Sequence, residues 1–264
     1  MLKKMRILCV FTVVIALVLC SMSTFAEPIN IDAFLINAGF PENLVTEMST
    51  IQKEMIYEHS VGKNIEFCGY AEKEFVITDE GALEERTNVS PRGGVISPAD
   101  MTLSVWGTRV YSTAGRVFYT VYPSFAWHTY KMVANDSFAM NMYPGWEAIP
   151  GERNFRLHIL NNQGQTAQYV DLAPTQSSST GYSYKIPSTV GFMQGLYEGY
   201  AYYDLDKVSS TASPRISLYY AHDTTSSFNL SYSLNVGPAG ISLAGDVDKV
   251  YTMSDNFEVS GMDQ

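Results

Sequence analysis

Residues 227–236 read Ser-Phe-Asn-Leu-Ser-Tyr-Ser-Leu-Asn-Val, a strict alternation of polar and apolar side chains. Successive side chains of a β-strand point to opposite faces, so this stretch predicts a strand with one buried and one solvated face. The same period of two recurs in four earlier stretches, 101–105, 117–121, 155–159 and 216–220. Turn-forming segments separate them, among them 113–115, 143–145 and 237–240. The pattern predicts a mainly β protein, folded as an antiparallel β-sandwich or barrel.

A small N-terminal helical segment, residues 27–62, precedes these strands. Asp32 is placed to cap a first short helix, and Gly39 is placed to end it. Ser49 and Gln52 have the spacing of a capping box, which would divide the following helical stretch. One apolar stripe with helical spacing, which we expect to dock on the rest of the fold, consists of Leu44, Met48, Ile51 and Met55.

The sequence divides into four segments. We predict a signal peptide at 1–26, the helical segment at 27–62, a strand pair with a loop or linker at 63–98, and an antiparallel β domain at 99–264. The loop is expected near 90–98, which holds two prolines and two glycines.

The first 26 residues have the three parts of a secretory signal peptide. Lys3, Lys4 and Arg6 precede an apolar run of about 13 residues, and small residues lead to a cleavage site near Ala26. The run is shorter than the roughly 20 residues that a membrane-spanning helix needs. We therefore predict a secreted, extracellular protein with no transmembrane segment after signal removal.

The net charge of the chain narrows the classes of partner that it can bind. Removal of residues 1–26 takes away three of the 17 basic residues and none of the 27 acidic ones, which changes the net charge from −10 to −13. So acidic a chain is not expected to bind nucleic acid.

The cysteine content bears on the origin of the chain. After removal of residues 1–26 only Cys68 remains of three cysteines, and a large secreted chain without disulfides favours a bacterial origin.

Motifs of known catalytic sites are absent from the sequence. It contains no Gly-x-Ser-x-Gly, no His-Glu-x-x-His and no Cys/His spacing for zinc, so we expect no metal centre and no cofactor. A non-catalytic protein is favoured, with catalysis left open. Glu147 beside Trp146, and Glu198 in an aromatic run, are the two carboxylates in a setting that suits carbohydrate hydrolysis. The pairs Asp204/Asp206 and Asp246/Asp248 offer oxygen ligands to calcium but lack the spacing of a known calcium loop.

The four histidines are interpreted through their neighbours. His59 lies near a predicted helix end, where it would act as a helix-capping cation. His128 is expected on the surface or in a groove, and His158 is expected to face water. His222 continues the inward side of its strand and is expected to be a hydrogen-bonded core histidine.

Tyrosine is the most distinctive feature of the composition, with 18 residues. Two adjacent pairs, Tyr202-Tyr203 and Tyr219-Tyr220, lie in predicted strands, so one ring of each pair must point outward. We expect the outward rings to be Tyr203 and Tyr219. Because Tyr and Trp stack on sugars and anchor interfaces, the candidate ligand-binding residues are Tyr203, Tyr219, Trp146 and Glu147.

These features together predict a secreted, non-catalytic protein that binds a glycan or an extracellular protein, or is associated with a surface. Two alternatives stay open. One is a secreted hydrolase acting on a carbohydrate. The other is a membrane-active β protein that inserts the hairpin 225–244, turned at Gly237-Pro238.

Overall fold

The structure is a computed structural model. It describes residues 29–77, 83–86, 100–129, 136–161, 163–186, 196–223, 232–237, 240–245 and 250–262. The predicted signal peptide, the loop near 90–98, the first part of the 227–236 stretch and the pair Asp246/Asp248 lie outside these residues.

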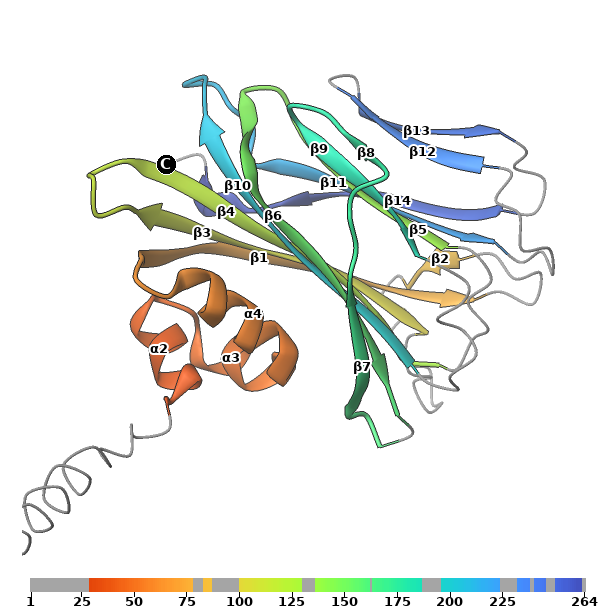
Figure 1. The fold of residues 1–264 in the computed structure, drawn as a ribbon, viewed down its shortest axis with the longest axis horizontal. Coiled ribbons are helices and arrows are strands. Elements are labelled where there is room, and N and C mark those ends of the chain that lie inside the picture. The colour runs from red at the N-terminus through yellow and green to blue at the C-terminus, as the bar shows by residue number, and fades with distance from the viewer. Residues whose placement is uncertain are drawn as a thin grey trace, which may run out of the picture.

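Three α-helices come before the strands in the described chain (Figure 1). The helices are α2 (Ile31–Asn37), α3 (Glu42–Glu47) and α4 (Thr50–Ser60), and a short 3-10 helix covers Ser260–Met262. The strands are β1 (Asn64–Ile77), β2 (Leu83–Glu85), β3 (Met101–Tyr111), β4 (Val117–Trp127), β5 (Asp136–Met142), β6 (Trp146–Leu160), β7 (Thr166–Asp171), β8 (Gln176–Ser177), β9 (Gly181–Ile186), β10 (Leu196–Lys207), β11 (Arg215–Asp223), β12 (Tyr232–Gly237), β13 (Gly240–Gly245) and β14 (Val250–Glu258).

The strands form two large antiparallel sheets and a hairpin. One sheet has seven strands in the order β2-β1-β3-β4-β10-β6-β7, and the other has five in the order β14-β11-β5-β9-β8. Every strand pair of the described chain is antiparallel. Within the described residues each sheet has two open ends, so the sheets form a sandwich and not a closed barrel. The predicted fold class, mainly β and antiparallel, is confirmed.

Aromatic rings join the two sheets. Phe125 of β4 contacts Phe138 of β5 and Tyr220 of β11, with ring centroids 5.5 and 4.9 Å apart. Phe155 of β6 stacks on Tyr184 of β9 at 4.6 Å. Such pairs add about 0.5–1.5 kcal/mol each beyond the area that they bury. The core therefore lies between the sheets, where the period of two places its apolar residues.

The three helices cover the outer face of the seven-stranded sheet (Figure 1). A second apolar cluster forms there, in which Leu35, Val45 and Ile56 of the helices pack with Trp106 and Tyr122 of β3 and β4. These two strands are buried on both faces as a result. The predicted stripe takes part as expected: Met48 is buried in this cluster and Leu44 and Met55 pack against it, whereas Ile51 faces a cavity described below.

Local capping follows the sequence with one correction. The Asn30 side chain, and not that of Asp32, accepts a hydrogen bond from the backbone of Ala33 at 3.0 Å, because the helix begins at residue 31. Gly39 ends it with a φ of 88°, a conformation that favours glycine. The capping box of Ser49 and Gln52 is confirmed, and it starts α4.

The hairpin β12-β13 packs on the outer face of the five-stranded sheet. Its Gly237 pairs with Gly240, so the hairpin turns where the sequence predicts. Leu234 is buried against Ala139 and Ala221, and Tyr219 packs against the same cluster. In this structure the apolar side of the hairpin is therefore occupied by the sheet.

Candidate functional site

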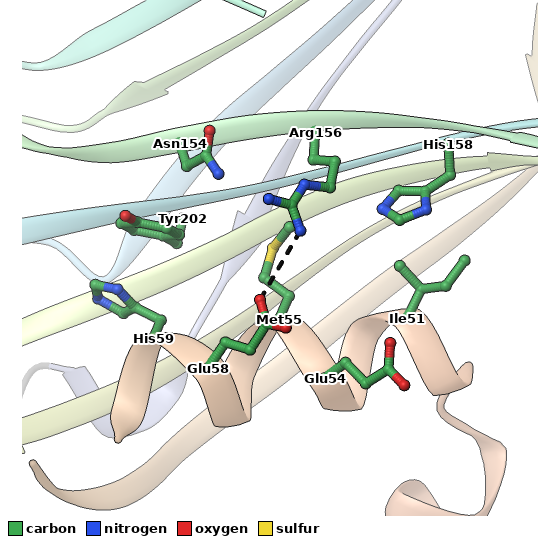
Figure 2. Close-up of a pocket in the computed structure, with 9 residues that line it drawn as sticks. All are labelled: Ile51, Glu54, Met55, Glu58, His59, Asn154, Arg156, His158 and Tyr202. Atoms are coloured by element: carbon green, nitrogen blue, oxygen red, sulfur yellow. Dashed lines mark ion pairs between the residues drawn. The ribbon is translucent and has the colours of Figure 1, made fainter. Parts of the chain in front are cut away.

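A cavity of about 250 Å³ lies between α4 and the strands β6 and β10 (Figure 2). On α4, residues 51, 54, 55 and 58 share one helical face, because side chains three and four positions apart are neighbours. On β6, residues 154, 156 and 158 share one strand face, because they are two apart. The lining residues are Ile51, Glu54, Met55, Glu58, His59, Asn154, Arg156, His158 and Tyr202.

A buried carboxylate fixes one end of the cavity. Asp204 is 1% exposed, and its Oδ1 lies 2.8 Å from Nε2 of His59 and accepts a hydrogen bond from the Thr120 hydroxyl at 2.6 Å. The Lys63 ammonium lies 3.7 Å from the other oxygen. His59 in turn stacks on Tyr202, with centroids 3.8 Å apart and planes 24° apart. His59 therefore connects the helix to the sheet through Asp204, in addition to its predicted place at the helix end.

Arg156 crosses the middle of the cavity wall. Its Nε donates to Asp171 of β7 at 2.8 Å, and its guanidinium lies 3.8 Å from the Glu58 carboxylate of α4, the pair dashed in Figure 2. The hydrogen bond to Asp171 raises the pKa of Arg156 further above its already high value. The guanidinium is thus held between the helix and the edge strand β7.

His158 is the most unusual group in the site. It is only 7% exposed, and Nε2 has no hydrogen-bond partner among the described residues, whereas Nδ1 lies 3.3 Å from the Thr166 hydroxyl. Burial, followed by the positive charge of Arg156, lowers the pKa of His158 to about 4, so the ring is neutral at pH 7. The expectation that His158 faces water is wrong, because the rings of Tyr169 and Tyr200 lie beside it, 6.0 and 5.7 Å away.

The lowered pKa of His158 predicts a loss of stability in acid. The unfolded chain takes up this proton near pH 6.5 and the folded protein only near pH 4, so the free energy of unfolding falls as the pH falls between these values. From pH 7 to pH 4.5 the contribution of this residue is about 2–3 kcal/mol. Urea unfolding of the wild type and of His158→Gln at both pH values measures it, since the variant should lose correspondingly less stability. An equal loss in both proteins would contradict the burial of a neutral ring.

Two of the predicted ligand-binding residues are buried in the core. Tyr203 is 0% exposed and stacks on Tyr182, so its expected outward direction is wrong: Tyr202 is the outward ring. Its neighbours two positions away, Ala201 and Leu205, also face the core, and their apolar character was a usable signal. Trp146 is 1% exposed and donates its indole N–H to the Ser213 carbonyl at 2.7 Å.

The other two predicted ligand-binding residues, Glu147 and Tyr219, lie apart. Glu147 is exposed on β6, and Tyr219 is half-buried beside the hairpin on the opposite sheet. A binding role for either stays a prediction. The cavity instead unites residues that the sequence did not single out as ligand contacts, above all Asn154, Arg156 and Tyr202.

The carboxylates considered for catalysis lie far apart. On β10, Glu198 is itself opposite His158 of β6, and Asp206 is opposite Glu147 of β6, so the two carboxylates are eight positions apart along β10. Eight strand residues span about 26 Å, whereas glycoside hydrolysis needs two carboxyl groups about 5–10 Å apart. Glu147 and Glu198 therefore do not form a catalytic pair.

The candidate calcium ligands of the described chain are already engaged. Asp204 is held by His59, Thr120 and Lys63, and Asp206 forms an ion pair with Arg116. Within the residues that the structure describes, no group of three or more His, Cys, Asp or Glu side chains is arranged to hold a metal ion.

Two further histidines follow their predictions. His222 is buried at the end of β11, and its Nδ1 lies 3.0 Å from the Asp136 carboxylate. His128 is exposed and its Nε2 lies 2.7 Å from the Thr102 hydroxyl. Over the described ranges, we find no helix with the length and apolar character needed to cross a membrane.

Comparison with known proteins yields weak structural likenesses only. No protein-family model matches the chain, and no curated protein matches it. Among solved structures, the chain is similar to the collagen-binding domain of Erysipelothrix rhusiopathiae surface protein RspB, with 13% identity and a TM-score of 0.31 over 70% of this chain and 55% of that one. It is also similar to the collagen-binding subdomain ACE19 of Enterococcus faecalis surface protein ACE, with 9% identity and a TM-score of 0.31 over 52% and 84%.

A third likeness is to the pilus backbone protein RrgB of Streptococcus pneumoniae, with 11% identity and a TM-score of 0.29 over 72% of this chain and 49% of that one. The chain thus spans about half the length of the RspB and RrgB chains. These identities and scores do not assign the chain to a family or give it a function.

Proposed function

We propose that this protein works outside the cell as a non-catalytic binding protein, and that the cavity beside α4 takes one sugar residue of a neutral glycan. The observation that carries the proposal is the buried, unpartnered Nε2 of His158 at the cavity wall. A buried polar atom without a partner costs about 1–3 kcal/mol, which a bound ligand can recover.

A hydroxyl group can form a hydrogen bond with this nitrogen in either tautomer of the neutral ring. If Nδ1 carries the proton and donates to Thr166, Nε2 is an acceptor, and if Thr166 donates to Nδ1, Nε2 is a donor. A hydroxyl both donates and accepts, so it satisfies both arrangements. Sugars present several hydroxyls at fixed spacing.

The rest of the lining suits a neutral ligand rich in hydrogen-bond donors. Glu54 and Glu58 contribute carboxylate acceptors, and the Asn154 amide contributes both a donor and an acceptor. An anionic ligand would meet the charges of Glu54, Glu58 and Asp171, of which Arg156 offsets only one. Pockets for drug-sized ligands have volumes of about 300–1,000 Å³, so a cavity of about 250 Å³ suits a smaller ligand such as one sugar ring.

The same geometry favours binding without hydrolysis. Glu54 and Glu58 lie one turn apart on a single helix, so both carboxylates line the same wall (Figure 2). Hydrolysis of a glycosidic bond needs carboxyl groups on two sides of that bond. In addition, Glu58 is paired with Arg156.

Binding is tested by incubating the purified protein with an array of neutral and acidic glycans while soluble fragments are measured. We expect retention of neutral glycans and no release of fragments. The His158→Phe variant keeps a ring of similar size but lacks the nitrogen, and we expect it to bind about 10- to 100-fold more weakly, the equivalent of roughly 1–3 kcal/mol.

His128→Phe is the matched control, because His128 is an exposed histidine that does not line the cavity. It should bind like the wild type. Equal binding by His158→Phe and the wild type, or no retained neutral glycan at all, would overturn the proposal. Release of fragments would replace it with the hydrolase alternative.

A further inference from the structure

Tyr169 on the edge strand β7 is an exposed aromatic ring beside the cavity. It is 58% exposed, and it is the only exposed Phe, Tyr or Trp side chain among the residues whose burial is described. In the β6–β7 register Tyr169 lies directly opposite His158, so the two side chains share the outer face of the sheet. Their ring centroids are 6.0 Å apart.

Arg156 holds this ring in position. Its Cζ lies 4.7 Å from the Tyr169 centroid, within the range of a cation–π contact. Asp171, two residues along β7, fixes the same guanidinium through a 2.8 Å hydrogen bond. The arginine that lines the cavity therefore also fixes the ring outside it, which reduces the entropy lost when a ligand stacks there.

The surroundings favour extension of a longer ligand toward β7. Helix α4 forms the opposite wall of the cavity, whereas β7 is the outermost strand of its sheet and most of its side chains are exposed. Its Ala167, two residues before Tyr169, is exposed and small.

We infer that Tyr169 forms a second subsite, on which the sugar next to the one in the cavity stacks, so that the ligand is a neutral oligosaccharide of at least two residues. This inference rests on the proposed function, because it places the first sugar in the cavity. Rigid tyrosine rings stack on the apolar faces of sugars while their hydroxyl stays in water.

Titration with sugars of increasing length tests the inference. The probes are glucose, galactose, mannose and N-acetylglucosamine, each with its homo-oligomers of two to four residues, and NMR of the His158 and Tyr169 ring protons detects even millimolar affinity. We expect the monosaccharide to shift the His158 signals alone. The disaccharide should shift both rings and bind about three- to tenfold more tightly, as a stacking contact of about 0.5–1.5 kcal/mol implies.

Two variants at position 169 give the decisive comparison. Tyr169→Ala should bind the disaccharide no more tightly than the monosaccharide, and Tyr169→Phe, which keeps the ring, should retain the gain. A gain that survives Tyr169→Ala, or no gain in the wild type, would overturn the second subsite and leave the cavity proposal standing. If no sugar shifts the His158 signals, the cavity proposal itself fails, and the second subsite fails with it.

Discussion

Replacement of Asp204 by alanine is expected to lower the free energy of unfolding by about 3–5 kcal/mol, because it removes a buried carboxylate that serves three neighbouring polar side chains. The substitution would leave His59 and the Thr120 hydroxyl without their shared acceptor, and Lys63 without its neighbouring charge. Urea unfolding at pH 7 measures the effect.

Asp206 provides the matched control two residues along the same strand. Its ion pair with Arg116 is between side chains that are 37% and 53% exposed, and such pairs contribute about 0–1 kcal/mol. Asp206→Ala should therefore change stability little. A loss below about 1 kcal/mol for Asp204→Ala would show that the carboxylate is not what fixes the helices on the sheet.

Tyr203→Ala is expected to destabilise the fold by about 3–5 kcal/mol, as large-to-small changes of buried aromatic residues do. The ring is fully buried between the sheets and stacks on Tyr182 at 4.8 Å with planes 6° apart. Thermal and urea unfolding would both report the loss. Glycan binding, measured under conditions in which the variant is folded, should be unchanged because Tyr203 does not line the cavity.

Tyr203→Phe separates the ring from its hydroxyl. The hydroxyl lies near that of Tyr184, but neither makes a hydrogen bond of normal geometry with the described residues. Phenylalanine should therefore stay within about 1 kcal/mol of the wild type. If Tyr203→Ala unfolded no more easily than Tyr203→Phe, the ring could not belong to the core.

The fold was predictable because its signals are local. Met101, Leu103 and Val105 occupy every second position of β3, and each is fully buried between the sheets. The alternation does not show which side chains point inward where both faces of a strand carry the same type of residue. On β10, Tyr200 and Tyr202 face the helices while Tyr197 and Tyr203 face the core, so residue type alone does not give the direction.

The site was not predictable because its walls meet only in three dimensions. The period of two along 155–159 puts Asn154, Arg156 and His158 on one face, as in the structure. What covers that face is decided by α4 and β7, which the period of two does not reveal. His158 is buried, and its pKa lowered, by these tertiary neighbours.

The contact between α4 and β10 also determines at which stage of folding the site can form. His59 and Asp204 are separated by 145 positions in the sequence, and Ser49 and Tyr200, which join the same elements, by 151. Contacts of such high sequence separation form slowly, because a long loop must close before they stabilise the chain. A chain folded only as far as β4 has one wall of the cavity and lacks the others. We therefore expect binding at the proposed site to appear in the last phase of refolding, so that a ligand of this cavity would be a kinetic probe of the completed topology.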